Sequence, residues 1–261
     1  GLHEWFDALK RSFPHWKIFV SNQLSDHEYT LGRPLFSEED VNKGNLHFNK
    51  DLHLSVSIRS YRSERVAAFV KSVLDLNVET ASKLYMEIHK QYPIFLTRDL
   101  NIARNWLRTQ ARGTERYGLV ASSGAIRLKP YGINVKASID PSYWFLNKKS
   151  DIRSSYFLED VATEFDIQGL ELDWACVAWD ADLRLKNEMW SFKSFRGTNW
   201  QDVKQDDAKL YLLNSYRVLL TRARQGMVIF IPPGDSTDAT RQPEFYDSTF
   251  AYLLNIGMQV L

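Results

Sequence analysis

Short apolar runs alternate along the chain with stretches of helical periodicity. Apolar residues occupy alternate positions in 52–58, and they run almost without interruption through 172–179 and 227–232. The first pattern is typical of a strand with one exposed face, and the other two are typical of buried strands. We predict further strands at 17–21, 93–97 and 117–122. Strands separated by helices form βαβ units, so the sequence predicts an α/β fold with a mostly parallel sheet and helices on both faces.

Apolar residues at intervals of three and four predict the helices between these strands. They cover residues 63–76, 78–91, 99–112, 206–224 and 243–257, with a single helical turn at 124–128. Ser63 and Asp99 are suitable N-caps, Asn77 is expected to end the helix before it, and Gly226 to stop the helix 206–224. Stretches rich in polar residues, glycine and proline predict insertions or long loops at 31–50 and 129–153, and a solvated loop at 234–241. A further insertion is expected near 181–205.

Composition and charge add limits to this picture. The 261 residues are 44% hydrophobic and 25% charged, with a net charge of +1, which excludes a disordered or collagen-like chain. The charge balance argues against an obligate polybasic nucleic-acid binder but allows a local basic groove. The single cysteine, Cys176, lies in an apolar run and is predicted to be a buried, unreactive thiol in a reducing compartment. No apolar run approaches the ~20 residues of a membrane span.

Three arginines stand near the end of segment 214–226, at positions 217, 222 and 224. Guanidinium groups close together at the end of a helix can clamp phosphate oxygens. The alternative is that Arg222 and Arg224 are ordinary cations that the helix dipole stabilises.

A second segment, 163–173, enters the apolar run 172–179 through a Gln-Gly pair. Glycine at a sharp turn lets the backbone approach a ligand closely, and Glu171 could accept a hydrogen bond from a sugar hydroxyl. The alternative is a tight turn with an acidic flank. A third segment, 54–63, is a predicted strand that ends in Arg59 and Arg62, which could equally be two solvated arginines on an exposed edge.

In their order along the chain these three segments resemble motifs IV, V and VI of the second RecA-like domain of superfamily 1 helicases. LTRAR at 220–224 resembles motif VI, FDIQGLELD at 165–173 resembles motif V, and LSVSIRS at 54–60 resembles motif IV. The spelling of 1–9, 154–174 and 214–232 resembles, more narrowly, the Schlafen group 3 type DNA/RNA helicase domain, a family of bacterial helicase-like proteins. The resemblance covers nearly the whole chain.

The resemblance implies a role for each candidate residue. Arg222 would reach the γ-phosphate of ATP across the cleft between two RecA-like domains, and Arg59 or Arg62 would be the motif IV arginine. Residues implied to bind the nucleotide are Gln168, Gly169, Glu171, Arg217 and Arg224. Residues at carboxyl ends of strands that are candidates for binding the phosphates of a nucleic-acid strand are Thr97, Arg98, Ser122 and Ser123.

The resemblance also implies what lies outside the chain. The sequence has no G-x-x-x-x-G-K-[ST] loop to hold phosphates and Mg²⁺, and it begins with Gly-Leu-His. We therefore expect residues 1–50 to follow a first RecA-like domain and 51–261 to form the second, with insertions near 129–153 and 181–205. ATP and Mg²⁺ would bind the full-length protein in the bacterial cytoplasm, and neither is expected for the fragment alone. The expected partners are the missing domain and single-stranded nucleic acid.

Two other functions fit parts of the sequence. Asp173, Asp180, Asp182 and Lys186 superficially suit a metal-dependent nuclease, but no glutamate is placed to complete the usual set of ligands. The histidines show no zinc-ligand spacing. A RecA-like scaffold that binds nucleic acid or protein without catalysis is the more serious alternative, and the intact residues of motifs V and VI favour a working motor half over it.

Overall fold

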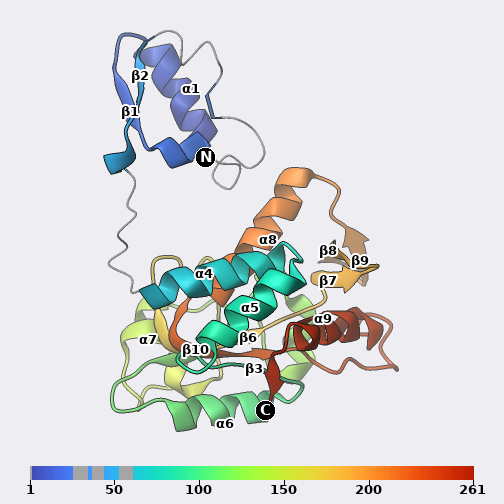
Figure 1. The fold of residues 1–261 in the computed structure, drawn as a ribbon. Helices are drawn as coiled ribbons and strands as arrows, with labels where there is room; N and C mark the ends of the chain where they lie inside the picture. The colour runs from blue at the N-terminus through green and yellow to red at the C-terminus, as the bar shows by residue number, and fades with distance from the viewer. Residues whose placement is uncertain (1, 26–34, 37–43, 53–60) are drawn as a thin grey trace. The chain divides into compact units, whose positions relative to one another are not determined.

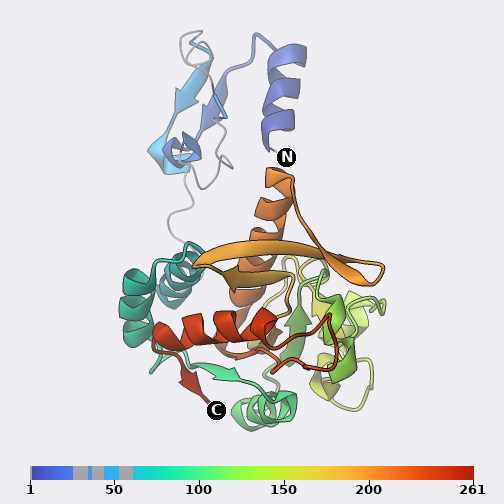
Figure 2. The same ribbon diagram turned by 90° about the vertical axis from the view of Figure 1, so that its right-hand side faces the viewer.

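The computed structural model describes residues 2–25, 35–36, 44–52 and 61–261. The chain divides into two compact units, residues 1–59 and 60–261. Figures 1 and 2 show both, and each is described by itself.

The first unit is a small α/β arrangement. Helix α1 (Leu2–Ser12) precedes two short parallel strands, β1 (Ile18–Val20) and β2 (Leu46–Phe48), with single 3₁₀ turns at Asn22–Ser25 and Lys50–Leu52. Its buried apolar residues are Phe6, Val20 and Leu35. The strand expected at 17–21 is confirmed. Most of the strand expected at 52–58 lies outside the described residues, as does Arg59.

The second unit is built on a six-stranded parallel sheet, which confirms the predicted α/β, RecA-like class. The strand order is β11-β3-β10-β6-β4-β5, and every neighbouring pair is parallel. The strands are β3 (Ile94–Thr97), β4 (Tyr117–Ala121), β5 (Val161–Thr163), β6 (Leu172–Ala178), β10 (Ala223–Phe230) and β11 (Gln259–Val260). Parallel strands share one edge where all begin and one where all end, here called the amino edge and the carboxyl edge.

Helices cover both faces of this sheet (Figure 1). One face packs against α4 (Tyr61–Leu74), α5 (Val78–Ile88), α8 (Asp206–Leu220) and α9 (Glu244–Asn255). The other face packs against α6 (Leu100–Gln110) and the 3₁₀ turns Ile126–Tyr131 and Ser155–Phe157.

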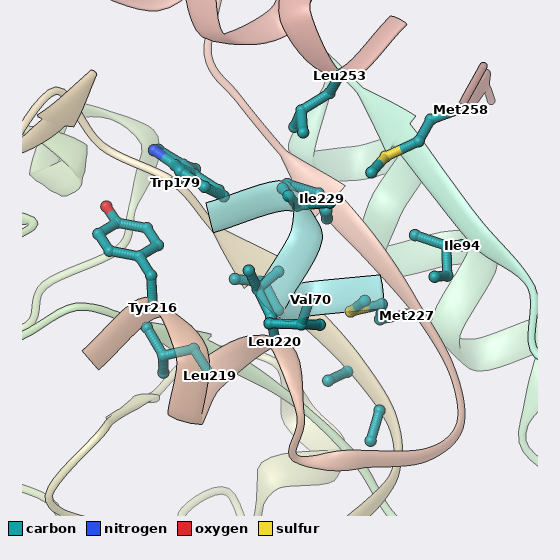
Figure 3. Close-up of a cluster of buried hydrophobic side chains, with 14 of the residues drawn as sticks. Val70, Ile94, Trp179, Tyr216, Leu219, Leu220, Met227, Ile229, Leu253 and Met258 are labelled. Atoms are coloured by element: carbon teal, nitrogen blue, oxygen red, sulfur yellow. The ribbon is translucent and has the colours of Figure 1, made fainter. Parts of the chain in front are cut away.

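Alternation along the central strands explains why two separate cores form. In β10, Met227 and Ile229 point into the first core, and Val228 and Phe230 into the second. Figure 3 shows Met227 and Ile229 among apolar side chains from several helices. Cys176 of β6 is fully buried in the second core, which confirms the predicted burial of its thiol, and this burial raises the pKa of the thiol to about 12.

The end of the long helix was predicted wrongly. Helix α8 stops at Leu220 rather than at 224, so Arg222 lies in the turn and Arg224 lies on β10. Gly226 does not stop a helix but sits inside β10, where a Cβ atom would come within 2.7 Å of the Pro93 carbonyl oxygen. The reason is that β10 begins pairing with β6 at Ala223, through a bulge that ends at Gly226.

The predicted caps are found at Asp99 and Asn77, and one helix begins earlier than predicted. Asp99 caps α6 as predicted, accepting from the backbone N–H of Asn101 at 2.7 Å. Asn77 follows the end of α4 and also caps the next helix, because its side chain accepts from the N–H of Thr80 at 3.0 Å. Helix α4 begins at Tyr61, two residues before the predicted cap Ser63.

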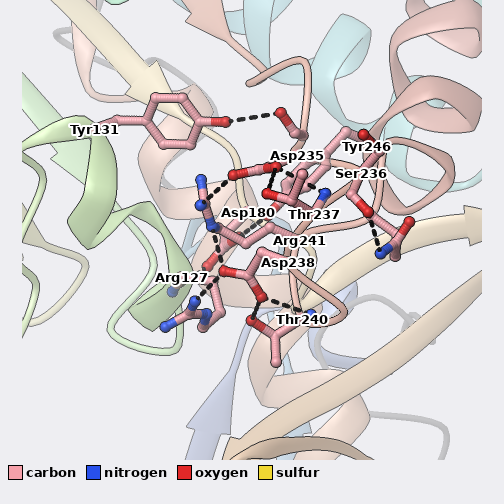
Figure 4. A network of polar contacts seen from close by, with 12 residues as sticks. Arg127, Tyr131, Asp180, Asp235, Ser236, Thr237, Asp238, Thr240, Arg241 and Tyr246 are labelled. Carbon is pink, nitrogen blue, oxygen red and sulfur yellow. Dashed lines mark hydrogen bonds and ion pairs between the residues drawn. The ribbon is translucent and has the colours of Figure 1, made fainter.

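Three segments predicted as insertions or loops carry ordered structure. Residues 181–205 contain an antiparallel sheet of β7 (Leu183–Lys186), β8 (Met189–Arg196) and β9 (Asn199–Asp202). Residues 129–153 contain the short helix α7 (Pro141–Leu146). The loop 234–241 is held by ion pairs of Arg241 with Asp235 and Asp238 and of Arg127 with Asp238 (Figure 4).

Candidate functional site

The sheet brings the segments that resemble motifs V and VI together at its amino edge. Residues 164–171 lead into β6, and the turn after α8 leads into its neighbour β10. Leu172 lies opposite Ala223 in the parallel register, and its N–H donates to the carbonyl oxygen of Arg222 at 2.9 Å. Parallel pairing therefore places Glu171, which precedes Leu172, beside Arg222, although the two are about 50 residues apart in sequence, and Gln168 and Gly169 lie in the turn just before it.

The segment 164–171 forms an ordered turn whose tip, at Gln168 and Gly169, is exposed to solvent. Asp166 accepts from both the N–H and the hydroxyl of Thr163, at 2.8 and 2.7 Å, which fixes the start of the turn. Gly169 has φ +85°, and no atom of the described residues lies within 4 Å of the position where a Cβ would stand. Gln168 is exposed beside it. A ligand can therefore approach the backbone here, and the left-handed conformation explains the glycine.

Arg222 and Arg217 lie where α8 ends. Arg222 is half-buried, and its Nε donates to the carbonyl oxygen of Val218 at 3.3 Å. Arg217 donates from Nη1 to Oδ1 of Asn214 at 2.6 Å, while its buried Nε has no hydrogen-bond partner within the described part of the chain. The last carbonyls of a helix carry partial negative charge, which favours cations at this position. An anion that bound here would supply the acceptor that Arg217 Nε lacks.

Arg224 does not join this pair. It points to Asp173 of β6, with Nη2 2.8 Å from Oδ1, and the other carboxylate oxygen accepts from the N–H of Arg116 at 2.7 Å. The three arginines therefore do not form the single clamp expected from a continuous helix, because Arg224 is on a strand and neutralises a carboxylate of the protein itself.

Ser122 and Ser123 follow β4 at the opposite, carboxyl edge. Ser122 is buried, and its hydroxyl donates to Asp182 Oδ2 at 2.7 Å. Ser123 donates to Glu164 from its N–H at 2.8 Å and from its hydroxyl at 2.7 Å. Both serines thus face carboxylates of the protein, and a phosphate that bound them would have to replace Asp182 or Glu164.

Thr97 and Arg98, also at the carboxyl edge, are held by neighbouring elements. The hydroxyl of Thr97 is buried and accepts from the N–H of Asp99 at 3.1 Å. Arg98 pairs with Asp247 of α9 at 2.6 Å, donates to the carbonyl oxygen of Pro232 at 3.0 Å, and stacks over Phe250. The four residues predicted to bind a nucleic-acid strand therefore form two groups rather than one row.

Comparison with known families decides the class of the domain. The family described as Schlafen group 3, DNA/RNA helicase domain, matches residues 3–233. The chain belongs to this family. No curated protein and no solved structure matches the chain. Membership makes this a helicase-type domain, in agreement with the resemblance of its motifs.

The Schlafen group 3 domain also contains a buried pair of carboxylates that sequence reasoning considered only as nuclease ligands. Asp180 and Asp182 follow β6 and are 1% and 0% exposed. Asp182 accepts from the hydroxyl of Tyr216 at 2.5 Å, and Asp180 from that of Tyr246 at 3.0 Å. Burial raises the pKa of Asp180 to about 7, with a further contribution from Asp182, and burial also raises the pKa of Asp182.

This pair gives no support to a nuclease. Within the described residues no group of three His, Cys, Asp or Glu could hold a metal ion. Asp182 already accepts from the hydroxyls of Tyr216 and Ser122, and Asp180 from the hydroxyl of Tyr246 and from backbone N–H groups. Lys186, the fourth residue of the nuclease hypothesis, lies exposed on β7.

The helicase domain has one more residue that sequence reasoning missed. Glu164 begins the motif V segment, is 8% exposed, and accepts from Ser123 and from the hydroxyl of Ser215 on α8 at 3.1 Å. An acidic residue directly after a strand and four residues before Gln168 was the available signal.

Arg62 lies in the first turn of α4, and its side chain, like Arg59, is outside the description, so the choice of motif IV arginine stays a prediction. Among the described helices none combines the length and apolar character needed to cross a bilayer.

Proposed function

We propose that this domain is the C-terminal motor half of an ATP-dependent superfamily 1-like helicase or translocase, supplying motifs IV, V and VI to a composite site. The observation that carries the proposal is the pairing of β6 with β10, which joins the Gln168–Gly169 turn to Arg222 at the amino edge. Family membership supports the helicase class. The P-loop and the carboxylates that hold Mg²⁺ would belong to a partner RecA-like domain, because this sequence contains no P-loop.

Within this proposal Arg222 is the residue that contacts the γ-phosphate of ATP. Phosphoryl transfer needs mainly positioning and neutralisation of charge that develops on the phosphate oxygens, which a planar guanidinium provides. The neighbouring Arg217 fits an anionic nucleotide, because its buried Nε has no acceptor among the residues that the structure describes. Arg224 would contribute only after release from Asp173, so we expect it to act on the orientation of β6 instead.

The motif V segment would couple the nucleotide to a nucleic-acid strand. It starts at the carboxyl edge, where Glu164 is bonded to β4 and α8, and ends at the amino edge, where Gln168 and Gly169 are exposed. A displacement of one end of this segment on ATP binding would therefore displace the other end. This is hinge closure driven by a ligand, and repeated cycles would move the domains along a strand.

The test is the substitution Arg222→Ala in the protein that carries this domain together with its P-loop domain. We expect kcat for nucleic-acid-stimulated ATP hydrolysis to fall by about 10³-fold or more, the range for removal of such an arginine. Arg222→Lys should recover only part of this, because an ammonium lacks the bidentate fork.

Arg108→Ala, on the exposed side of α6, is the matched control and should leave turnover unchanged. Circular dichroism and urea denaturation would establish that each variant folds. Unchanged turnover in a folded Arg222→Ala protein would refute the proposal and favour a non-catalytic RecA-like scaffold that binds nucleic acid or protein.

A further inference from the structure

A large pocket opens at the carboxyl edge of the sheet, away from the amino-edge residues. Its volume is about 610 Å³, and its walls come from the residues after β4, the start of the motif V segment, the β8–β9 hairpin and α8. Pockets for small ligands commonly measure about 300–1,000 Å³, so this one is large enough for a nucleotide. We call it the carboxyl-edge pocket.

One part of the pocket lining is acidic and already supplied with hydrogen-bond donors. Glu164 and Asp182 line it, and both are buried. Ser123 and Ser215 donate to Glu164, while Ser122 and Tyr216 donate to Asp182. Buried carboxylates repel an incoming phosphate, so the charged part of a ligand would not bind against this part of the lining.

Other positions around the pocket are cationic. Arg196 at the end of β8 and Lys204 after β9 line it and are exposed. Within the described part of the chain no carboxylate lies at ion-pair distance from either residue, whereas Lys193 is paired with Asp202 at 2.5 Å. Two exposed cations that no described carboxylate neutralises can bind phosphate groups of a strand.

Two aromatic side chains complete the lining. Phe165 is 72% exposed and Tyr211 of α8 is 65% exposed, and both line the pocket. Removing a large aromatic ring from water is favourable, so a ring left this exposed at a pocket is suited to stacking with a flat apolar partner. Nucleobases are such partners, and base–aromatic stacking contributes about 1–3 kcal/mol per base.

We propose that the carboxyl-edge pocket binds one nucleotide of a single-stranded nucleic acid, with the base stacked on Phe165 and Tyr211 and the phosphate on Arg196 and Lys204. The acidic part of the lining fixes this orientation, because it excludes phosphate and leaves the cations to bind it. The proposal deepens the proposed function and rests on it, since it names where the strand binds. Phe165 is three residues before Gln168, so the stacked base would lie on the coupling segment itself.

The test measures binding of the 261-residue chain without ATP. A fluorescein-labelled single strand of about 12 nucleotides, a typical length for such sites, is titrated and followed by anisotropy. We expect Phe165→Ala and Tyr211→Ala each to weaken binding by roughly 5- to 150-fold, from loss of stacking. Both side chains are exposed, so neither substitution should disturb folding.

Salt dependence separates the phosphate contacts from the stacking contacts. The double variant Arg196→Gln, Lys204→Gln should lower the slope of log K against log salt by about 1.4, the value for two phosphate contacts on a single strand. Phe165→Ala should leave the slope unchanged. The matched controls are Tyr143→Ala for the aromatic residues and Lys90→Gln with Lys136→Gln for the cations, because these residues are exposed outside the pocket.

Several results would overturn the proposal. One is wild-type affinity in both aromatic variants, and another is a loss in the control pair equal to that in the pocket pair. Displacement of the strand by polyglutamate at equal charge concentration would assign the pocket to an acidic polypeptide instead. Because ATP is absent throughout, these outcomes are independent of the Arg222 test: the pocket can fail while hydrolysis still depends on Arg222, and the reverse.

Discussion

The buried position of Asp180 predicts how the free energy of unfolding of the domain changes with pH. Asp180 is 1% exposed and lies beside Tyr246 (Figure 4), whose hydroxyl donates to its carboxylate. The carboxylate also accepts from the N–H of Ala181 at 2.8 Å and from the N–H of Arg127 at 2.9 Å. Burial and, to a smaller extent, the neighbouring Asp182 together raise its pKa from 3.8 to about 7. Loss of water around a carboxylate thus outweighs three hydrogen bonds to it.

A carboxyl group whose pKa is higher in the folded than in the unfolded state binds more protons when folded. The free energy of unfolding therefore falls as the pH rises above the unfolded value and levels off above the folded value. A shift from 3.8 to about 7 corresponds to about 4 kcal/mol in total. Of this, about 2 kcal/mol would be lost between pH 5 and pH 7.

The assay is urea denaturation at intervals from about pH 5 to about pH 8, comparing the wild type with Asp180→Asn. An amide does not titrate, so the variant should lose stability less steeply with pH, by about 2 kcal/mol between pH 5 and pH 7. The amide nitrogen would face the N–H of Arg127, so the variant should also be less stable at acidic pH. This loss of stability is the same at every pH, so it does not change how steeply the free energy of unfolding varies with pH.

Asp206→Asn is the matched control. This exposed aspartate has its pKa lowered by a hydrogen bond and ion pair from Lys209, so its contribution is lost only at more acidic pH. Its curve should parallel that of the wild type. Parallel curves for the wild type and Asp180→Asn would refute the reasoning, because they would mean that Asp180 is ionised in the folded protein throughout this range.

Two further predictions concern the motif V turn and the start of β10. Gln168→Ala, in the protein that includes the P-loop domain, should leave basal ATP hydrolysis intact and remove its stimulation by single strands; normal stimulation would count against the coupling role. Gly226→Ala should destabilise the domain by about 1–3 kcal/mol in urea denaturation, because the new Cβ would meet the Pro93 carbonyl oxygen at 2.7 Å and Trp174 at 2.8 Å. Gly169→Ala, where no atom lies nearby, is the contrasting variant: its cost comes only from the positive φ, and wild-type stability for Gly226→Ala would contradict the packing argument.

The central sheet could be predicted because its strands are buried on both faces. Continuous apolar runs identify β6 and β10 without reference to neighbours, and the cap at Asp99 identifies the start of α6. The antiparallel sheet β7–β9 escaped prediction because β8 is only half-buried and β9 is mostly exposed. In the run Met189–Arg196, polar and aromatic residues alternate without a clear apolar face.

The candidate site, too, could be predicted from the sequence only in part. The resemblance indicated which residues of motifs V and VI matter, and β-sheet pairing then placed them together. Contacts between distant elements could not be predicted. Arg98 is bound by Asp247, which is 149 residues away, and Arg224 turns to Asp173 because the strand starts earlier than the periodicity of α8 indicates.

The distance between the two edges explains why the motif V segment matters for any coupling. The seven residues of β6 span about 23 Å, so the amino-edge arginines and the carboxyl-edge pocket cannot share a ligand. Residues 164–171 connect the two edges directly, with Glu164 bonded to β4 and α8 at one end and Gly169 open at the other. The sheet itself is packed on both faces and resists deformation. Communication between a nucleotide and a strand would therefore run through this turn, and Glu164 would set how far it can move.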